Sequence, residues 1–194
     1  MNAALQEDTD TPYHRAIKDY AAGRYAQALD KYQAIADENP RDRTALLGLA
    51  MSYEQLERFA EARQAYAQYL AVEPANRGVL SHVLRQVLSQ PLEQSRDDLT
   101  MLVEAGVDGA EIMAALAEVS SALGNHEGAL EYASSAVQKA PDVTAYYLNA
   151  GILADRLNRK AAAVAFYEQF LERYAEQSIA IDTPIDNIRD RLNY

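Results

Sequence analysis

Apolar residues recur along this chain at the spacing of an α-helix. The clearest run is Leu46, Leu49, Ala50 and Tyr53, at i, i+3, i+4 and i+7, and the same offset starts again at Met113. This spacing places the side chains on one face of a helix. No segment alternates apolar and polar residues over the length of a strand. The pattern predicts an all-α protein.

Three kinds of position repeat with a period of 34 residues, or 33 in one case. The small positions are Ala28, Ala62, Ala129 and Ala163, and the aromatic positions are Tyr32, Tyr66 and Tyr167. The turn positions are Gly23, Glu57, Gly124 and Asn158. Gly and Asn tolerate left-handed backbone best, so each period predicts two helices joined by a tight turn. Because such a pair cannot bury its own apolar faces, neighbouring pairs are expected to stack.

These residues resemble the tetratricopeptide repeat (TPR) family, which is built from 34-residue helix pairs. Residues 43–76 match best, through Leu46, Leu49, Ala50, Tyr53, Phe59, Ala62, Tyr66 and Pro74. The resemblance implies a right-handed α-solenoid over residues 9–177, with repeats at 9–42, 43–76, 77–109, 110–143 and 144–177. It also implies close helix contacts at small buried residues, namely Ala50, Ala62, Ala117, Ala129 and Ala163.

The third period, residues 77–109, departs from the pattern, because polar residues occupy its small and aromatic positions. The helix boundaries predicted here are Pro91, which ends the first helix, a capping box of Ser95 and Asp98, and the pair Asp108 and Glu111, which opens the next helix. We interpret this period as a degenerate repeat. The alternative is a hinge that divides the array into two lobes, 1–76 and 110–194.

The two ends of the chain lie outside the repeats. Residues 1–8 are expected to fray, and residues 178–194 are predicted to form a loop and a capping helix. Thr183 and Pro184 supply an N-cap and a first-turn proline for that helix. Its apolar stripe, formed by Ile185, Ile188 and Leu192, is expected to close the last repeat.

The composition narrows the classes of function. Lys and Arg total 18 against 29 Asp and Glu, for a net charge of −11, which disfavours nucleic acid as a partner. The absence of Cys excludes disulfides and thiolate metal sites. No apolar stretch has the length of a membrane span, and the N-terminus does not resemble a signal peptide. We expect a cytoplasmic protein, or a periplasmic one if an export signal has been removed.

No catalytic or metal-binding motif is present. The three histidines, His14, His82 and His126, are far apart in the sequence, and Gly106 with Gly109 is better explained by helix capping than by a phosphate loop. We therefore expect a protein that is not an enzyme and has no cofactor and no bound metal.

The resemblance implies a concave groove lined by the first helix of each pair. The predicted partner-binding residues are Tyr13, Ile17, Tyr20, Leu47, Met51, Glu54, Arg85, Glu118, Leu148 and Ile152. Exposed apolar side chains of this kind mark partner sites, although each apolar member has a second interpretation as a core residue. Apolar residues stand where the chaperone-docking branch of the family places Lys and Asn, so a cochaperone role is disfavoured.

Arg85 has two interpretations. It either forms an ion pair with Glu54 and Glu118, which occupy inner positions of the flanking repeats, or binds a carboxylate of the partner. The predicted function is a non-catalytic scaffold that binds a segment of another protein. The Ala-rich helices look bacterial, where such proteins often serve pili, secretion or polysaccharide export. A self-associating structural protein is the alternative, and an enzyme subunit is the third class.

Overall fold

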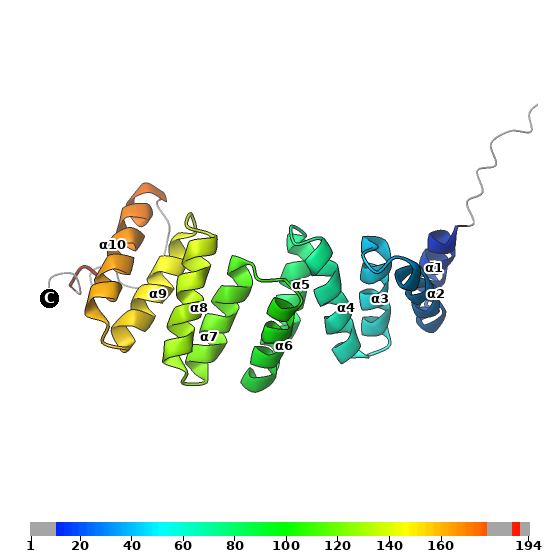
Figure 1. The fold of residues 1–194 in the computed structure, drawn as a ribbon, viewed down its shortest axis with the longest axis horizontal. Coiled ribbons are helices and arrows are strands. Elements are labelled where there is room, and N and C mark those ends of the chain that lie inside the picture. The colour runs from blue at the N-terminus through cyan, green and yellow to red at the C-terminus, as the bar shows by residue number, and fades with distance from the viewer. Residues whose placement is uncertain (1–10, 178–187, 191–194) are drawn as a thin grey trace, which may run out of the picture. The chain divides into compact units, whose positions relative to one another are not determined.

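The computed structural model describes residues 11–177 and 188–190. Within these residues the secondary structure is helical, without strands, and in residues 11–177 ten α-helices follow one another through short turns (Figure 1). They are α1 (Pro12–Ala21), α2 (Tyr25–Glu38), α3 (Arg43–Gln55), α4 (Phe59–Val72), α5 (Arg77–Leu88), α6 (Leu92–Glu104), α7 (Ala110–Ala122), α8 (His126–Lys139), α9 (Thr144–Arg156) and α10 (Lys160–Gln177). The predicted all-α fold of consecutive helix pairs is confirmed.

The turns inside the pairs adopt the left-handed backbone that their residue types predict. The φ angles are 73° at Gly23, 58° at Glu57, 83° at Gly124 and 56° at Asn158. After each of these residues, a backbone N–H returns to a carbonyl five residues earlier, as in Arg24 to Asp19 at 2.9 Å. This hydrogen bond satisfies a carbonyl at the end of the first helix and reverses the chain.

The described chain divides into two compact units. Unit 1 comprises Met1–Gln86 and Met101–Val107, and unit 2 comprises Val87–Thr100 and Asp108–Tyr194, so α5 and α6 contribute to both. The predicted repeat boundaries, and the choice between a degenerate repeat and a hinge at 77–109, stay predictions.

In unit 1, the first four helices pack consecutively, α1 against α2, α2 against α3 and α3 against α4 (Figure 1). The main buried side chains are Ala28, Leu29, Tyr32, Ala45, Leu46, Leu49, Ala50, Ala62, Tyr66 and Leu70. Small residues allow two helices to approach closely, and the side chain of a neighbouring tyrosine then fills the remaining space. At Gly48, an added Cβ atom would lie 2.5 Å from the ring of Tyr32.

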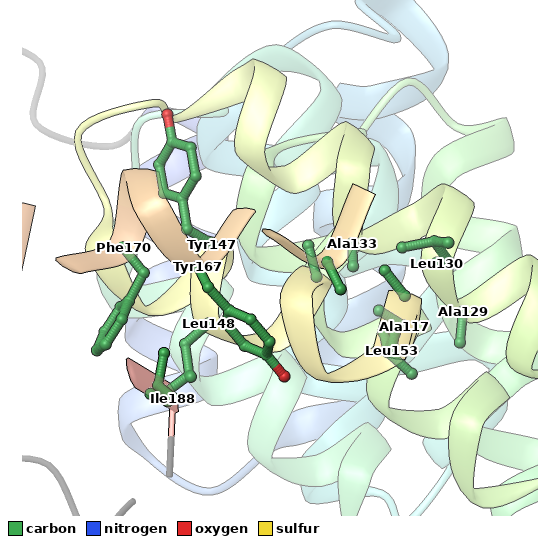
Figure 2. Close-up of a cluster of buried hydrophobic side chains, with 13 residues drawn as sticks. Ala117, Ala129, Leu130, Ala133, Tyr147, Leu148, Leu153, Tyr167, Phe170 and Ile188 are labelled. Atoms are coloured by element: carbon green, nitrogen blue, oxygen red, sulfur yellow. The ribbon is translucent and has the colours of Figure 1, made fainter. Parts of the chain in front are cut away.

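In unit 2, the helices α7 to α10 also pack consecutively, around one apolar cluster. Figure 2 shows this cluster, whose largest members are Leu130, Tyr147, Leu148, Leu153, Tyr167, Phe170 and Ile188. The small residues predicted to be buried are 5% exposed or less in both units, at Ala50, Ala62, Ala117, Ala129 and Ala163. That prediction is therefore confirmed.

The helix boundaries predicted around Ser95 and Asp108 are wrong. Helix α6 begins at Leu92, where the carbonyl of Pro91 accepts the N–H of Ser95 at 2.9 Å. Ser95 therefore lies inside the helix, and its buried hydroxyl donates to the carbonyl of Val87 at 2.8 Å. Gly109 is the N-cap of α7, and Asp108 instead accepts a hydrogen bond from Lys139 Nζ at 2.7 Å.

The predicted capping helix is described only at residues 188–190. These residues are helical, and Ile188 is 3% exposed within the unit 2 cluster. Thr183, Pro184, Ile185 and Leu192 lie outside the described residues. Ile188 thus packs where the apolar stripe was expected to pack.

Candidate functional site

In unit 1, α1 and α3 are the first helices of their pairs, and their predicted site residues stand at the same intervals. Tyr13, Ile17 and Tyr20 stand at i, i+4 and i+7 on α1, and Leu47, Met51 and Glu54 do the same on α3. This interval keeps each trio on one side of its helix. Because α1 and α3 also contact each other, we treat these six residues as one surface, the α1–α3 face.

The α1–α3 face leaves apolar side chains open to solvent. Ile17 is 51% exposed and Tyr13 is 36% exposed, whereas Tyr20, Leu47 and Met51 are half-buried. Exposed apolar residues are ordinary when single, but a contiguous set is typical of a contact surface. The face can therefore bury apolar side chains of another molecule.

One end of the α1–α3 face is held by Asp42. Its Oδ1 accepts the N–H of Ala45 at 2.8 Å as the N-cap of α3, and its Oδ2 accepts the hydroxyl of Tyr13 at 2.7 Å. Burial by itself raises the pKa of Asp42, but the hydrogen bonds from Ala45 and Tyr13 outweigh it, so the pKa lies below its usual value. Asp42 thus caps α3 and fixes the ring of Tyr13.

We expect Asp42→Ala to lower the free energy of unfolding by about 1 kcal/mol at neutral pH, because the helix loses its cap. A carboxyl with a lowered pKa in the folded state stabilises the protein above its unfolded pKa of about 3.9. This contribution is lost as the pH falls through the folded-state value. We therefore expect the free energies of unfolding of Asp42→Ala and of the unmodified chain to differ less at pH 3.5 than at pH 7, as measured by urea denaturation. Asp30→Ala, an exposed position in α2, is the control, and an Asp42→Ala effect of equal size at both pH values contradicts the argument.

The other end of the face is held by Glu54, on which side chains of two more helices converge. Its carboxylate accepts the hydroxyl of Tyr66 at 2.6 Å and the amide of Gln86 at 2.5 Å, and His82 Nε2 lies 3.1 Å away. Burial raises the pKa of Tyr66, and the hydrogen bond to Glu54 raises it further. The ring of His82 meets the ring of Tyr66 edge-on at 5.5 Å. Glu54 is therefore held in place by α4 and α5.

The sequence did not lead us to His82 and Gln86. Their spacing of four residues on a predicted helix was the available clue, but Arg85 between them was singled out instead. Arg85 is exposed and forms no ion pair with Glu54 among the described residues. The ion-pair interpretation of Arg85 with Glu54 is not supported, because Tyr66, His82 and Gln86 contact that carboxylate and Arg85 does not. Its interpretation as an anchor for a partner's carboxylate stays a prediction.

Unit 2 carries the remaining predicted residues. Glu118 on α7 is exposed, and Ile152 on α9 is 37% exposed. Leu148, one turn before Ile152, is only 9% exposed and belongs to the same apolar cluster as Ile188 (Figure 2). Leu148 is thus a core residue in the structure, in the same cluster as Ile188 of the C-terminal segment.

A hollow of about 970 Å³ lies in unit 1 on a different side of α3. Leu46, Leu49 and Tyr53 line it from α3, and residues of α2, α4 and the end of α6 complete it. Sequence reasoning did not predict this hollow, because its walls come from several second helices that lie far apart in the sequence.

The comparison with protein families decides the class of the chain. A model of the tetratricopeptide repeat matches residues 13–77 and 114–178, which together are more than half of the chain. The chain belongs to the tetratricopeptide repeat family. TPR proteins bind protein partners, so its family function is that of a protein-binding scaffold. The matched residues include nearly all of α1 to α4 and most of α7 to α10, whereas α6 lies between the two matches.

Several solved structures are similar to this TPR chain. A crystal structure of MamA protein has a TM-score of 0.49 and 17% identity, with 93% of this chain and all of that chain covered. MamA from Desulfovibrio magneticus RS-1 has a TM-score of 0.46 and 16% identity, with 91% and 100% covered. No curated protein sequence matches the chain.

Two kinds of feature are missing from the described part of this TPR chain. No three or more His, Cys, Asp or Glu side chains gather there in a way that could hold a metal ion. None of the helices in residues 11–177 or 188–190 combines the length and apolar character needed to cross a membrane.

Proposed function

We propose that this TPR protein is a non-catalytic adaptor that binds an apolar segment of a partner protein on the α1–α3 face. The observation that carries the proposal is the exposure of Ile17 and Tyr13 beside the half-buried Tyr20, Leu47 and Met51. Burying aliphatic and aromatic side chains against them supplies most of the affinity. Met51 adds adaptability, because an unbranched side chain can follow partners of different shape.

The wider setting belongs to the same proposal. We place the adaptor in a bacterial envelope, pilus, secretion or polysaccharide-export assembly, in the cytoplasm or the periplasm, with a protein rather than a nucleic acid as partner. The net charge of −11 supports the exclusion of nucleic acid. In unit 2, we propose Glu118 and Ile152 as a second contact, because both are exposed on first helices.

The test is a selection of random 12-residue peptides, displayed on phage, against the full chain. We expect Leu47→Asp to weaken the binding of the selected peptides by about thirtyfold, equal to about 2 kcal/mol, because a charge then lies in an apolar contact. Fluorescence anisotropy with the synthetic peptides measures this loss. Circular dichroism at 222 nm is expected to show unchanged helical content.

The matched control is Phe59→Asp. Phe59 is 51% exposed at the start of α4 and lies outside the α1–α3 face, so its replacement is expected to leave peptide binding unchanged. If both variants bind the peptides as the unmodified chain does, the α1–α3 face is not the site. If the chain instead forms oligomers in light scattering and selects no peptide, it is the self-associating alternative.

A further inference from the structure

Two carboxylates lie at opposite ends of the α1–α3 face. Asp42 stands at the N-terminal end of α3 beside Tyr13, and Glu54 stands in the last turn of α3. The side chains between them on this side of α3 are Leu47 and Met51. Twelve residues of helix separate the two acids, so they lie about 18 Å apart along the axis.

No Lys or Arg forms an ion pair with either carboxylate among the described residues. Asp42 is held by the N–H of Ala45 and the hydroxyl of Tyr13, and the adjacent Arg43 pairs with Glu73 at 3.2 Å instead. By contrast, the buried Asp19 in α1 forms ion pairs with both Arg24 and Lys31. Asp42 thus keeps acceptor capacity, because a carboxylate accepts about four hydrogen bonds.

Glu54 likewise has no Lys or Arg partner at its end of the face, although both of its oxygens already contact neighbouring side chains. Tyr66 and Gln86 are uncharged donors, and His82 completes the set. The side chain of Glu54 still keeps 20% of its surface exposed. Burial raises the pKa of Tyr20, and the charges of Tyr25 and Glu54 raise it further. A cation on a partner therefore meets a carboxylate that its neighbours hold in a fixed position.

From this arrangement we infer, on the basis of the proposed function, that the partner segment carries apolar side chains between two basic side chains. The basic groups are spaced to meet Asp42 and Glu54, about 18 Å apart, while the apolar side chains cover Ile17, Leu47 and Met51. In an extended segment, at about 3.3 Å per residue, this distance corresponds to about five residues. The apolar contact supplies affinity, and the two charges fix the register and direction of the segment.

Arg85 defines the competing possibility. It is exposed on α5, one turn from His82, and would favour an acidic partner. The structure favours a basic segment, because the α1–α3 face itself carries a carboxylate at each end and its own residues include no Lys or Arg. A selection of peptides without bias distinguishes the two.

The experiment reads the sequences that the phage selection enriches on the full chain. We expect Lys and Arg to be enriched severalfold over the library, on both sides of an apolar centre, with Asp and Glu depleted. One enriched peptide is then synthesised with each basic residue in turn replaced by Gln. On the unmodified chain, each replacement should weaken binding about tenfold, as measured by fluorescence anisotropy.

Glu54→Gln and Asp42→Asn are the protein variants that complete a double-mutant cycle with the Gln-substituted peptides. Each variant is expected to bind the parent peptide about tenfold more weakly than the unmodified chain does. For one of the two Gln-substituted peptides, however, the variant and the unmodified chain should bind with equal affinity. This pairing identifies which basic residue meets which carboxylate, and a purely structural effect of the substitution would weaken all peptides alike. Glu104→Gln, an exposed acid on α6, removes the same charge elsewhere and should change nothing.

The outcomes separate the two proposals. Peptides whose binding depends on Leu47 but that show no preference for basic residues overturn this inference and leave the proposed function standing. If the selected peptides are acidic and Arg85→Gln abolishes their binding, this inference is overturned, and Arg85 is instead the anchor for an acidic partner. Peptides whose binding does not depend on Leu47 overturn the proposed function, and the inference with it.

Discussion

Phe170→Ala is expected to lower the free energy of unfolding by about 3–5 kcal/mol. Phe170 is 1% exposed in the unit 2 cluster (Figure 2). Its ring lies 5.7 Å from the ring of Tyr174. Removing it takes away apolar contacts and leaves a cavity that helices joined by short turns can close only in part. Urea denaturation followed by circular dichroism at 222 nm measures the loss.

The control for this prediction is the same substitution at an exposed site. Phe59 is 51% exposed, so Phe59→Ala is expected to change the free energy of unfolding by less than about 0.5 kcal/mol. A loss below about 1 kcal/mol for Phe170→Ala would show that the ring is not part of a packed core.

The second large effect is expected at Gly48. A Cβ at this position would lie 2.5 Å from the Cε1 and Cζ atoms of Tyr32, whose ring is itself buried at 5% exposure. Gly48→Leu adds three further carbons, so either the ring or the contact between α2 and α3 must move. We expect a loss of about 3 kcal/mol, the upper part of the range for overpacked cores, measured by urea denaturation.

A rescue and a control test the cause of that loss. Tyr32→Ala combined with Gly48→Leu should lose less stability than the two single variants added together, because the leucine then fills the space of the ring. Gly78→Leu is the matched control, since its nearest neighbour would be Asn76 Oδ1 at 3.5 Å. In an exposed helix position, leucine replaces glycine without loss and adds up to about 1 kcal/mol. Equal losses at Gly48 and Gly78 would rule out the clash as the cause.

The parts of the fold that could be predicted depend on local geometry repeated along the chain. The interval of 34 residues between small, aromatic and turn positions was enough to place the tight turns, including the left-handed Glu57 and Asn158. Steric limits on the backbone act over a few residues, so the sequence expresses them directly.

The predictions from residue spacing are wrong where a contact outside the local pattern determines the position of a side chain. Ser95 and Asp98 have the spacing of a capping box, but the hydroxyl of Ser95 donates to the carbonyl of Val87 inside the fold. Leu148 stands at a groove position of the repeat, yet it is buried in the cluster that contains Ile188. The repeat pattern does not include the C-terminal segment, so it could not indicate that burial.

Helical period and backbone sterics are encoded within each repeat, so the helix pairs, their turns and the small residues at which helices meet can be predicted from the amino-acid order. Which inner residues are exposed, and how their polar neighbours are arranged, depends on the packing of separate helices. Glu54 receives its partners from α4 and α5, at Tyr66, His82 and Gln86, which are 12 to 32 residues away along the chain. Exposure and hydrogen-bond partners depend on which side chains packing brings together, and the spacing of residues along the chain does not contain that information.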